Sequence, residues 1–212
     1  ALDDYLLRLS VKPKPRLCFV PTASGDSLAN IQRFYDVFSD ERAKPTHLDL
    51  FRHDGKNLKD FLLEQDIIYV GGGNTKSMLA VFEEWGVNNL LQESYKSGKI
   101  LAGVSAGAIC WFTKGITDSW ESELKVIDCL DFLDGCCCPH YDGEKDRRPS
   151  VMKFLNSDKI NSCVAIEDGA AVHYKSGNLL NAISFQKGAK VFNLYKNNDE
   201  IHEIPMDCIK IY

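Results

Sequence analysis

The pentapeptide Gly103-Val104-Ser105-Ala106-Gly107 is the segment of this sequence whose residue types and spacing best suit covalent chemistry. It matches G-x-S-x-G, follows an apolar stretch and precedes a helical one, which is the context that a nucleophilic serine on a sharp strand-to-helix turn requires. Such a turn exposes Ser105 Oγ at the carboxyl end of the sheet, where ligands bind in open α/β folds. The amide of Ala106 would then point at the oxyanion of a tetrahedral intermediate. The alternative is a glycine-rich turn that only packs well.

A second glycine-rich loop, Gly71-Gly72-Gly73-Asn74-Thr75, also follows an apolar strand and precedes a helix. Glycines leave amides uncovered and let a substrate approach the main chain closely. A phosphate-binding loop is one interpretation, but the sequence here matches neither G-x-x-x-x-G-K-[ST] nor G-x-G-x-x-G. A loop that donates an amide to an oxyanion fits better, since Ser105 needs a second donor, and a purely structural turn is the third interpretation. We expect Gly72, Gly73 and Asn74 to bind substrate.

A nucleophilic serine needs a general base, and His140 is the best candidate among the five histidines. It lies in the segment Cys138-Pro139-His140-Tyr141-Asp142, after a turn-rich stretch. The remaining histidines lie on expected strands or strand exits, where a surface histidine is the ordinary case: His47, His53, His173 and His202.

The base must in turn be oriented by a carboxylate. Asp118 follows Gly115-Ile116-Thr117, and Asp168 lies in Ile166-Glu167-Asp168-Gly169 at the end of an expected strand. Each could equally be a turn aspartate, and the residue pattern does not choose between them.

Apolar segments alternate with segments that have helical periodicity along the first half of the chain. Strands are expected at 17–20, 46–51, 67–70 and 99–104, and helices at 27–38, 56–64, 75–97 (with a break near Gly86) and 106–112. Apolar strands separated by helices indicate a parallel sheet covered on both faces. Further on, short strands bounded by turns are expected at 164–166, 172–174, 191–195 and 209–212. We therefore expect a single domain over residues 1–212, a doubly wound and mostly parallel α/β fold with short antiparallel strands towards its C-terminus.

Composition excludes several classes of protein. The chain has 212 residues, of which 44% are hydrophobic and 26% charged, which is typical of a globular protein and not of a disordered one. Its net charge of −5 argues against a nucleic-acid partner, because phosphate binding needs a basic surface. No apolar run approaches the ~20 residues of a membrane span. We expect a soluble protein with no membrane partner.

The eight cysteines do not follow the spacing of a disulfide framework. Most are scattered in apolar runs, and Cys136, Cys137 and Cys138 are consecutive, unlike the C-x₂-C spacing of zinc sites. We expect reduced thiols in the cytoplasm, with no metal and no cofactor. A metal held by the three cysteines and His140 is the alternative.

Five segments together resemble the peptidase E family of serine peptidases, which includes aspartyl dipeptidase and, more distantly, cyanophycinase. They are PTAS at 21–24, YVGGGNT at 69–75, GVSAGA at 103–108, PHYD at 139–142 and EDGAAV at 167–172. The resemblance covers almost the whole chain. It implies a fold like that of class I glutamine amidotransferases, with serine in place of their cysteine. An ordinary α/β-hydrolase is disfavoured, since His140 follows Ser105 closely and only about half of the chain remains after that serine.

The resemblance also implies roles. Ser105 is the implied nucleophile and His140 the base, the family's first proposed acid falls on Asp118, and its alternative acid falls on Asp168. The implied oxyanion donors are the amides of Ala106 and of Gly73 or Gly72. We favour Asp168 as the partner of His140, because residues at strand ends are held more rigidly than turn residues.

The expected activity is hydrolysis of short peptides by a serine dipeptidase or exopeptidase. A non-peptidase serine amidase or hydrolase and a catalytically silent binding protein are the alternatives. The aspartyl dipeptidases select an N-terminal aspartate with basic residues, and Arg147 and Arg148 are the nearest ones here. The family's opening strand is missing, so we expect the natural chain to begin upstream of Ala1.

Overall fold

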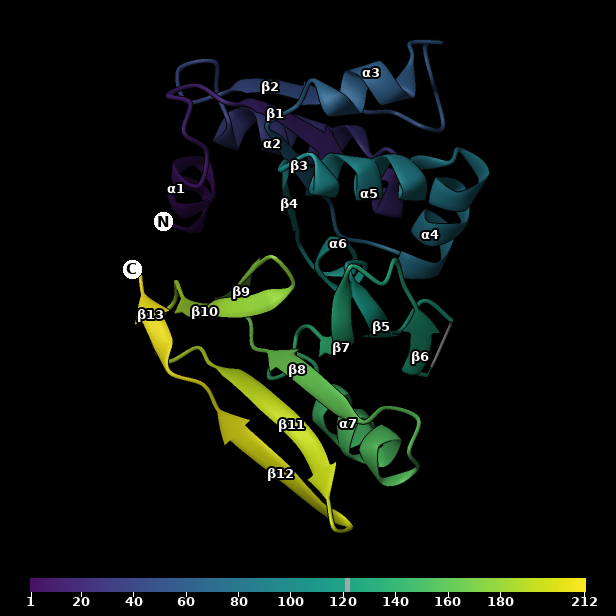
Figure 1. Ribbon diagram of the computed structural model, residues 1–212, viewed down its shortest axis with the longest axis vertical. Helices are drawn as coiled ribbons and strands as arrows, with labels where there is room; N and C mark the ends of the chain where they lie inside the picture. The colour runs from purple at the N-terminus through teal and green to yellow at the C-terminus, as the bar shows by residue number, and fades with distance from the viewer. Residues whose placement is uncertain (121–122) are drawn as a thin grey trace. The chain divides into compact units, whose positions relative to one another are not determined.

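The computed structural model describes residues 1–120 and 123–212, and the chain divides into two units (Figure 1). One unit comprises residues 3–108, and the other comprises residues 109–212 together with residues 1–2. Each unit has its own sheet and its own buried core. The single domain expected over residues 1–212 stays a prediction.

A four-stranded parallel sheet, in the order β2-β1-β3-β4, forms the centre of the unit of residues 3–108. Its strands are β1 (Arg16–Val20), β2 (Lys44–His47), β3 (Ile67–Val70) and β4 (Ile100–Gly103). The apolar residues of β1 and β3 are almost all buried, as their uninterrupted hydrophobicity predicts. Because all four strands are parallel, their carboxyl ends lie at one edge of this sheet.

Helices precede, connect and follow these strands. They are α1 (Leu2–Arg8), the 3₁₀ turn η1 (Thr22–Ser24), α2 (Leu28–Val37), α3 (Leu58–Leu63), α4 (Thr75–Glu84), α5 (Val87–Lys96) and α6 (Ala106–Ile109). Helix α2 packs on β1 through Phe34, whose ring stacks on Phe19 with centroids 4.9 Å apart. The break expected near Gly86 is confirmed, since Gly86 adopts a left-handed conformation (φ 65°) between α4 and α5.

The strand expected at 46–51 is wrong in its bounds, because β2 ends at His47. Beyond it, the amides of Leu50 and Phe51 donate hydrogen bonds to the carboxylate of Asp26, each at 2.8 Å. These bonds satisfy the main-chain amides without a neighbouring strand. The alternation of apolar and polar residues therefore continues beyond the end of the strand.

A six-stranded mixed sheet, in the order β12-β11-β8-β7-β5-β6, forms the unit of residues 109–212. Its strands are β5 (Phe112–Thr117), β6 (Lys125–Asp128), β7 (Leu133–Cys138), β8 (Ser162–Ile166), β11 (Val191–Asn197) and β12 (Glu200–Pro205). Strands β5, β7 and β8 are parallel, whereas β6, β11 and β12 join antiparallel. Helix α7 (Arg147–Asn156) buries Val151, Phe154 and Leu155 in a core with β7, β8 and β11.

A small three-stranded sheet accompanies it, in the order β13-β10-β9, with β9 (Ala170–Lys175), β10 (Asn178–Ser184) and β13 (Cys208–Lys210). The late strands expected from sequence are confirmed, with slightly different bounds. The helix expected at 106–112 is wrong after Ile109, where α6 ends and β5 soon begins. Cys110 and Trp111 form a turn before β5, and their carbonyls accept hydrogen bonds from the amides of Leu130 and Phe132 instead of continuing the helix.

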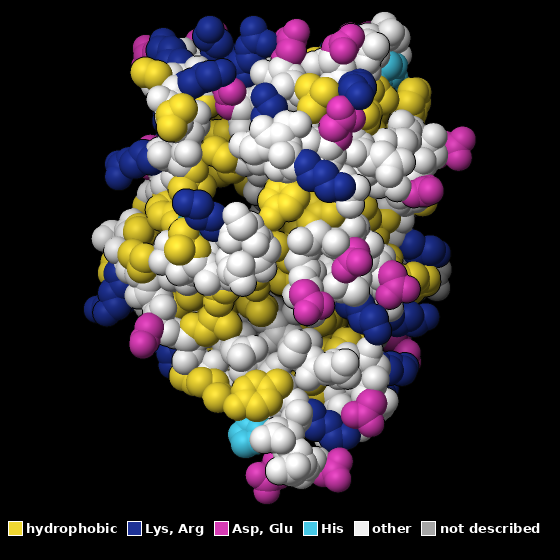
Figure 2. All heavy atoms as spheres, in the orientation of Figure 1, with side chains coloured by type: hydrophobic (Ala, Val, Ile, Leu, Met, Phe, Trp, Pro, Cys, Tyr) yellow, Lys and Arg dark blue, Asp and Glu magenta, His cyan; other side chains and the backbone are white. Residues whose placement is uncertain are grey.

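Over residues 1–120 and 123–212, no helix combines the length and apolar character that crossing a bilayer requires. On the face that Figure 2 shows, Lys and Arg side chains are scattered among Asp and Glu side chains.

Candidate active site

Ser105 occupies a strained turn between β4 and α6. Its φ of 54° lies in the left-handed region, which is uncommon for a residue with a side chain and marks a candidate functional position. The turn is packed against the end of β3, where the amide of Val104 donates to the carbonyl of Val70 at 3.1 Å. A Cβ on Gly107 would lie 2.1 Å from that same carbonyl oxygen, so only glycine fits there. The strand–turn–helix context predicted for Ser105 is present.

The loop after β3 lies beside Ser105, because β3 and β4 are neighbours in the parallel sheet. A Cβ on Gly72 would lie 3.2 Å from Ser105 Cβ, so this glycine borders the serine directly. Gly73 has a φ of 141° and passes so close to η1 that a Cβ would meet the carbonyl oxygen of Ala23 at 2.2 Å. These two close approaches explain why the loop is built of glycines.

The amides of the loop after β3 differ in whether they donate to a main-chain carbonyl. Those of Gly71 and Asn74 donate to the carbonyls of Val20 and Ala23, at 3.0 and 2.8 Å. Between them, the amides of Gly72 and Gly73 donate to no backbone carbonyl of the described residues. Ala106 begins α6, and an amide in the first turn of a helix has no carbonyl partner within it. The side chain of Asn74 caps α4 by accepting from the amide of Ser77 at 2.9 Å.

His140 and Asp168 form a hydrogen bond, with 2.7 Å between His140 Nδ1 and Asp168 Oδ1. They follow β7 and β8, which pair in parallel with Cys138 opposite Ala165, so both lie at the carboxyl edge of the six-stranded sheet. The His140 side chain is 29% exposed and that of Asp168 is 55% exposed. The proximity expected between these two residues is therefore observed, and Nδ1 is the ring nitrogen that the carboxylate engages.

Asp142 and Gly143, two and three positions after His140, define the place of Asp168. The carboxylate of Asp142 accepts a hydrogen bond from the Asp168 amide at 2.8 Å. A Cβ on Gly143 would lie 2.2 Å from Asp168 Oδ2, so the carboxylate occupies space that only glycine leaves. Sequence reasoning quoted Asp142 in a motif but gave it no role, and it missed Gly143. Their position two and three residues after His140 is the signal that could have found them.

Asp118 has a different partner. It follows β5, is 68% exposed, and lies 3.8 Å from the guanidinium of Arg147. Arg147 itself is 3% exposed and donates to Glu144 and to the carbonyl of Ile116, each at 2.7 Å. Arg148 pairs with the carboxylate of Glu203. Both arginines suggested for substrate selection are thus bonded to groups of this chain.

The other histidines have structural environments. His47 Nδ1 contacts the Tyr35 hydroxyl at 2.7 Å, and His53 accepts from the Gly55 amide while packing on Trp85. Partial burial, together with Lys175, lowers the pKa of His173. His202 stacks on Tyr195. His47 Nε2 lies 3.8 Å from the Asp49 carboxylate, beyond hydrogen-bonding distance.

The cysteines next to His140 are interior side chains. Cys136, Cys137 and Cys138 are all buried, and the first and third lie in the core under α7. Burial raises the pKa of Cys138 to about 12, so its thiol stays protonated and is a poor metal ligand at neutral pH. Within the described ranges, no group of three or more His, Cys, Asp and Glu side chains is arranged to hold a metal ion.

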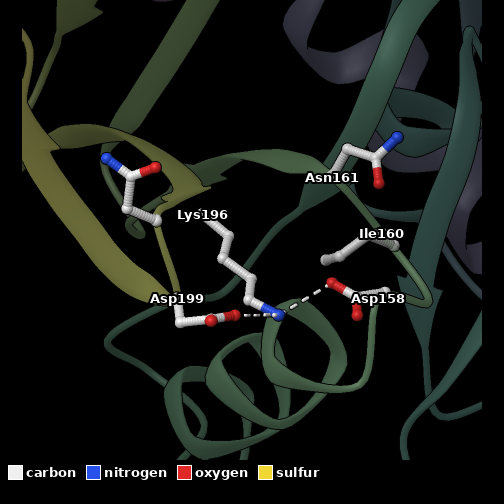
Figure 3. A pocket seen from close by; sticks show the side chains of 6 residues that line it. Asp158, Ile160, Asn161, Lys196 and Asp199 are labelled. Atoms are coloured by element: carbon white, nitrogen blue, oxygen red, sulfur yellow. Dashed lines mark hydrogen bonds and ion pairs between the residues drawn. The ribbon is translucent and has the colours of Figure 1, made fainter.

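A hollow of about 460 Å³ opens elsewhere on the unit of residues 109–212 (Figure 3). Its lining includes Lys196, whose ammonium group contacts Asp158 at 2.9 Å and Asp199 at 3.4 Å. The two carboxylates neutralise this lysine, and neither His140 nor Asp168 lines the hollow. It is therefore separate from the candidate site.

The chain is similar to known proteins over most of its length. The family model described as peptidase family S51 matches residues 1–181. The uncharacterized peptidase YgaJ of Bacillus subtilis is 46% identical over 206 residues, covering 97% of this chain and 89% of that protein. Peptidase E of Shewanella denitrificans is 26% identical over 149 residues, covering 64% of this chain and 61% of the relative.

A solved structure has the same fold. The crystal structure of a peptidase from an acI-B1 actinobacterium superposes with a TM-score of 0.70 at 17% identity, covering 98% of this chain and 87% of that one. The mostly parallel α/β architecture with antiparallel C-terminal strands is thereby confirmed. Together with the family match over most of its length, this identifies the chain as a member of peptidase family S51 and a serine-type peptidase.

Proposed function

We propose that this peptidase removes residues from short peptides, as a dipeptidase or other exopeptidase, with Ser105 as nucleophile, His140 as general base and Asp168 as the orienting acid. The observation that carries the proposal is the 2.7 Å hydrogen bond between His140 Nδ1 and Asp168. A carboxylate on Nδ1 leaves Nε2 as the nitrogen that takes the proton of the serine hydroxyl. The left-handed turn at Ser105 supports the nucleophile.

In the proposed reaction, Ser105 Oγ attacks the scissile carbonyl carbon while His140 Nε2 accepts its proton. The amides of Gly72 or Gly73 and of Ala106 stabilise the oxyanion, and His140 then protonates the leaving amine. Water, deprotonated by His140, hydrolyses the acyl-enzyme and restores the serine. Asp168 stays ionised throughout and stabilises the imidazolium that forms twice in each cycle.

Asp118 has no place in this scheme as the partner of His140. Its 3.8 Å contact with the buried Arg147 supports a role in loop structure. Arg147 and Arg148 are both engaged by carboxylates of this chain, so we assign neither of them to recognition of an acidic substrate. Among the relatives, the name peptidase E supports peptide substrates and does not name a side chain.

We also propose a cytoplasmic location. None of the eight cysteines, all of which lie in the described ranges, forms a disulfide, and six of them are buried. Unpaired thiols are typical of proteins from reducing compartments.

A fluorophosphonate probe followed by peptide mapping tests the nucleophile, and a dipeptide library read by mass spectrometry tests the substrate. We expect labelling at Ser105, and a loss of kcat of about 10⁶-fold in Ser105→Ala with the fold unchanged. His140→Ala should abolish labelling, whereas the matched control His202→Ala should label as the wild type does. Labelling without hydrolysis of any peptide would indicate a different serine hydrolase or amidase. Absence of labelling in the folded wild type would indicate a binding protein.

A further inference from the structure

Glu203 joins the last long strand of the chain to the residue beside His140. It lies in β12, beyond the residues 1–181 that the family model matches. One of its carboxylate oxygens accepts a hydrogen bond from the Tyr141 hydroxyl at 2.6 Å, and the other pairs with Arg148 at the start of α7. The Glu203 side chain is only 15% exposed, so the bond to Tyr141 is a sheltered, charge-assisted one.

Tyr141 is held as firmly as a core residue. It is 4% exposed, it belongs to the core under α7, and its ring lies 5.6 Å from that of Phe192. Burial, together with the Glu203 carboxylate, raises the pKa of the Tyr141 hydroxyl, so it remains a donor. Its amide donates to the carbonyl of Ile166 at 3.1 Å. Both the main chain and the side chain of Tyr141 are therefore fixed.

His140 needs such a neighbour, because its backbone is strained. Its φ of 55° is unfavourable for a residue with a side chain, and such a conformation persists only where its surroundings determine it. The ring must also keep Nδ1 at 2.7 Å from Asp168 Oδ1. Relaxation of the turn towards ordinary backbone angles would rotate the imidazole away from that carboxylate.

We propose that Glu203 is a positioning residue for His140, and that it acts through the Tyr141 hydroxyl while Arg148 holds its carboxylate in place. This inference rests on the proposed function of His140 as the base. It assigns to the C-terminal hairpin of β11 and β12 a part in catalysis that requires no contact with substrate. A residue of purely structural importance would change the free energy of unfolding and leave kcat per folded molecule unchanged.

Four variants test this: Tyr141→Phe, Glu203→Ala, Glu203→Gln, and the double variant Tyr141→Phe/Glu203→Ala. At equal folded fraction, we expect the first two to lower kcat by about tenfold, since small displacements of a catalytic group are costly, with KM little changed. Glu203→Gln should lose less kcat than Glu203→Ala, because its amide oxygen still accepts from Tyr141 although its NH₂ group cannot accept from Arg148. The double variant should lose no more than either single variant. Tyr35→Phe removes the hydroxyl that contacts His47 and serves as the matched control with wild-type kcat.

A second measurement does not depend on turnover. In protein with ¹⁵N-labelled histidine, the Nδ1–H resonance of His140 is assigned by its loss in Asp168→Asn. Tyr141→Phe and Glu203→Ala should shift or broaden it, whereas Tyr35→Phe should not. Wild-type kcat in Tyr141→Phe, additive losses in the double variant, or an unchanged resonance in both single variants would overturn the inference. If the wild type hydrolyses no peptide, the proposed function fails, and the resonance alone decides whether Glu203 positions His140.

Discussion

The turn that carries Ser105 and the turn that carries His140 are held in place by different means. The serine turn, residues 103–107 with the facing loop 71–75, is packed main chain against main chain. Added Cβ atoms would meet the carbonyl oxygens of Val70 and Ala23 at 2.1 and 2.2 Å. The histidine turn, residues 138–143 with 166–168, is held mainly by side chains, those of Asp142, Asp168 and Glu203.

This difference determines how each turn responds to substitution. Main-chain contacts need glycines at positions that lie close together in the sequence. An added Cβ there would meet a main-chain carbonyl, which cannot move aside as a flexible side chain can. Side-chain contacts draw on distant residues, since Asp168 and Glu203 are 28 and 62 positions away from the residues they bind. Loss of one such contact leaves the strands paired and shifts only the group that it held. The serine turn is thus coupled to folding and the histidine turn to activity.

The largest expected effect on stability is that of Gly107→Ala. Gly107 lies within α6, where alanine would ordinarily be favoured by about 1 kcal/mol. Its Cβ would instead collide with the carbonyl of Val70, and we expect the free energy of unfolding to fall by about 4 kcal/mol or more. Urea denaturation followed by circular dichroism measures this change. Wild-type stability in Gly107→Ala would show that the serine turn can accommodate a Cβ at residue 107 despite the short distance to the Val70 carbonyl.

The next prediction concerns kcat, and it compares Asp168→Asn in the histidine turn with Asp118→Asn outside it. An amide at 168 can no longer favour the tautomer with the proton on Nδ1, and we expect kcat to fall by about 10⁴-fold. Asp118→Asn should lower kcat far less, because Asp118 faces Arg147 and lies outside the hydrogen bond to His140. Both rates are measured per folded molecule. A larger loss in Asp118→Asn would transfer the role of the acid to that residue.

Gly143→Ala is the counterpart of Gly107→Ala in the histidine turn. Its Cβ would meet Asp168 Oδ2, the end of a half-exposed side chain that can move away. We expect the free energy of unfolding to change by less than about 1 kcal/mol, whereas kcat should fall by about 100-fold as the carboxylate leaves His140. Denaturation and kinetics on the same preparation separate the two quantities. Equal losses of stability in Gly107→Ala and Gly143→Ala would remove the distinction between the turns.

The same distinction explains what the sequence could predict. Gly103 to Gly107 and Gly71 to Thr75 are continuous in sequence, so their strand–turn–helix context was predictable from the residues alone. The strands around Ile68 and Leu101 were predictable for the same reason, since their apolar runs are local, although only the first is buried and β4 is half-buried.

The partner of His140 could not be chosen from sequence. Asp118 and Asp168 are both turn aspartates, and only the pairing of β7 with β8 brings one of them to the imidazole. Glu203 carries no local signal at all, because its partner Tyr141 is 62 positions away. The false helix at 110–112 has a similar cause, since the hydrogen bonds that take the carbonyls of this segment out of a helix come from residues 130–132.

The smallest expected effect is that of reagents directed at thiols and metals, which tests whether the histidine turn depends on the cysteines before it. Burial raises the pKa of Cys18 and Cys138 to about 12 and also raises that of Cys137, so few thiolates form at pH 7.5 and iodoacetamide should react slowly. The half-buried Cys208 should be modified first, and all eight cysteines should react only in denaturant. Mass spectrometry counts the modified thiols while peptide hydrolysis is followed in parallel, and EDTA is added in a separate arm. Activity should persist in iodoacetamide and in EDTA, because a carboxylate and not a thiol or metal holds His140. Loss of activity in EDTA with recovery on adding zinc would instead make His140 a ligand, and the histidine turn would then be organised by a metal.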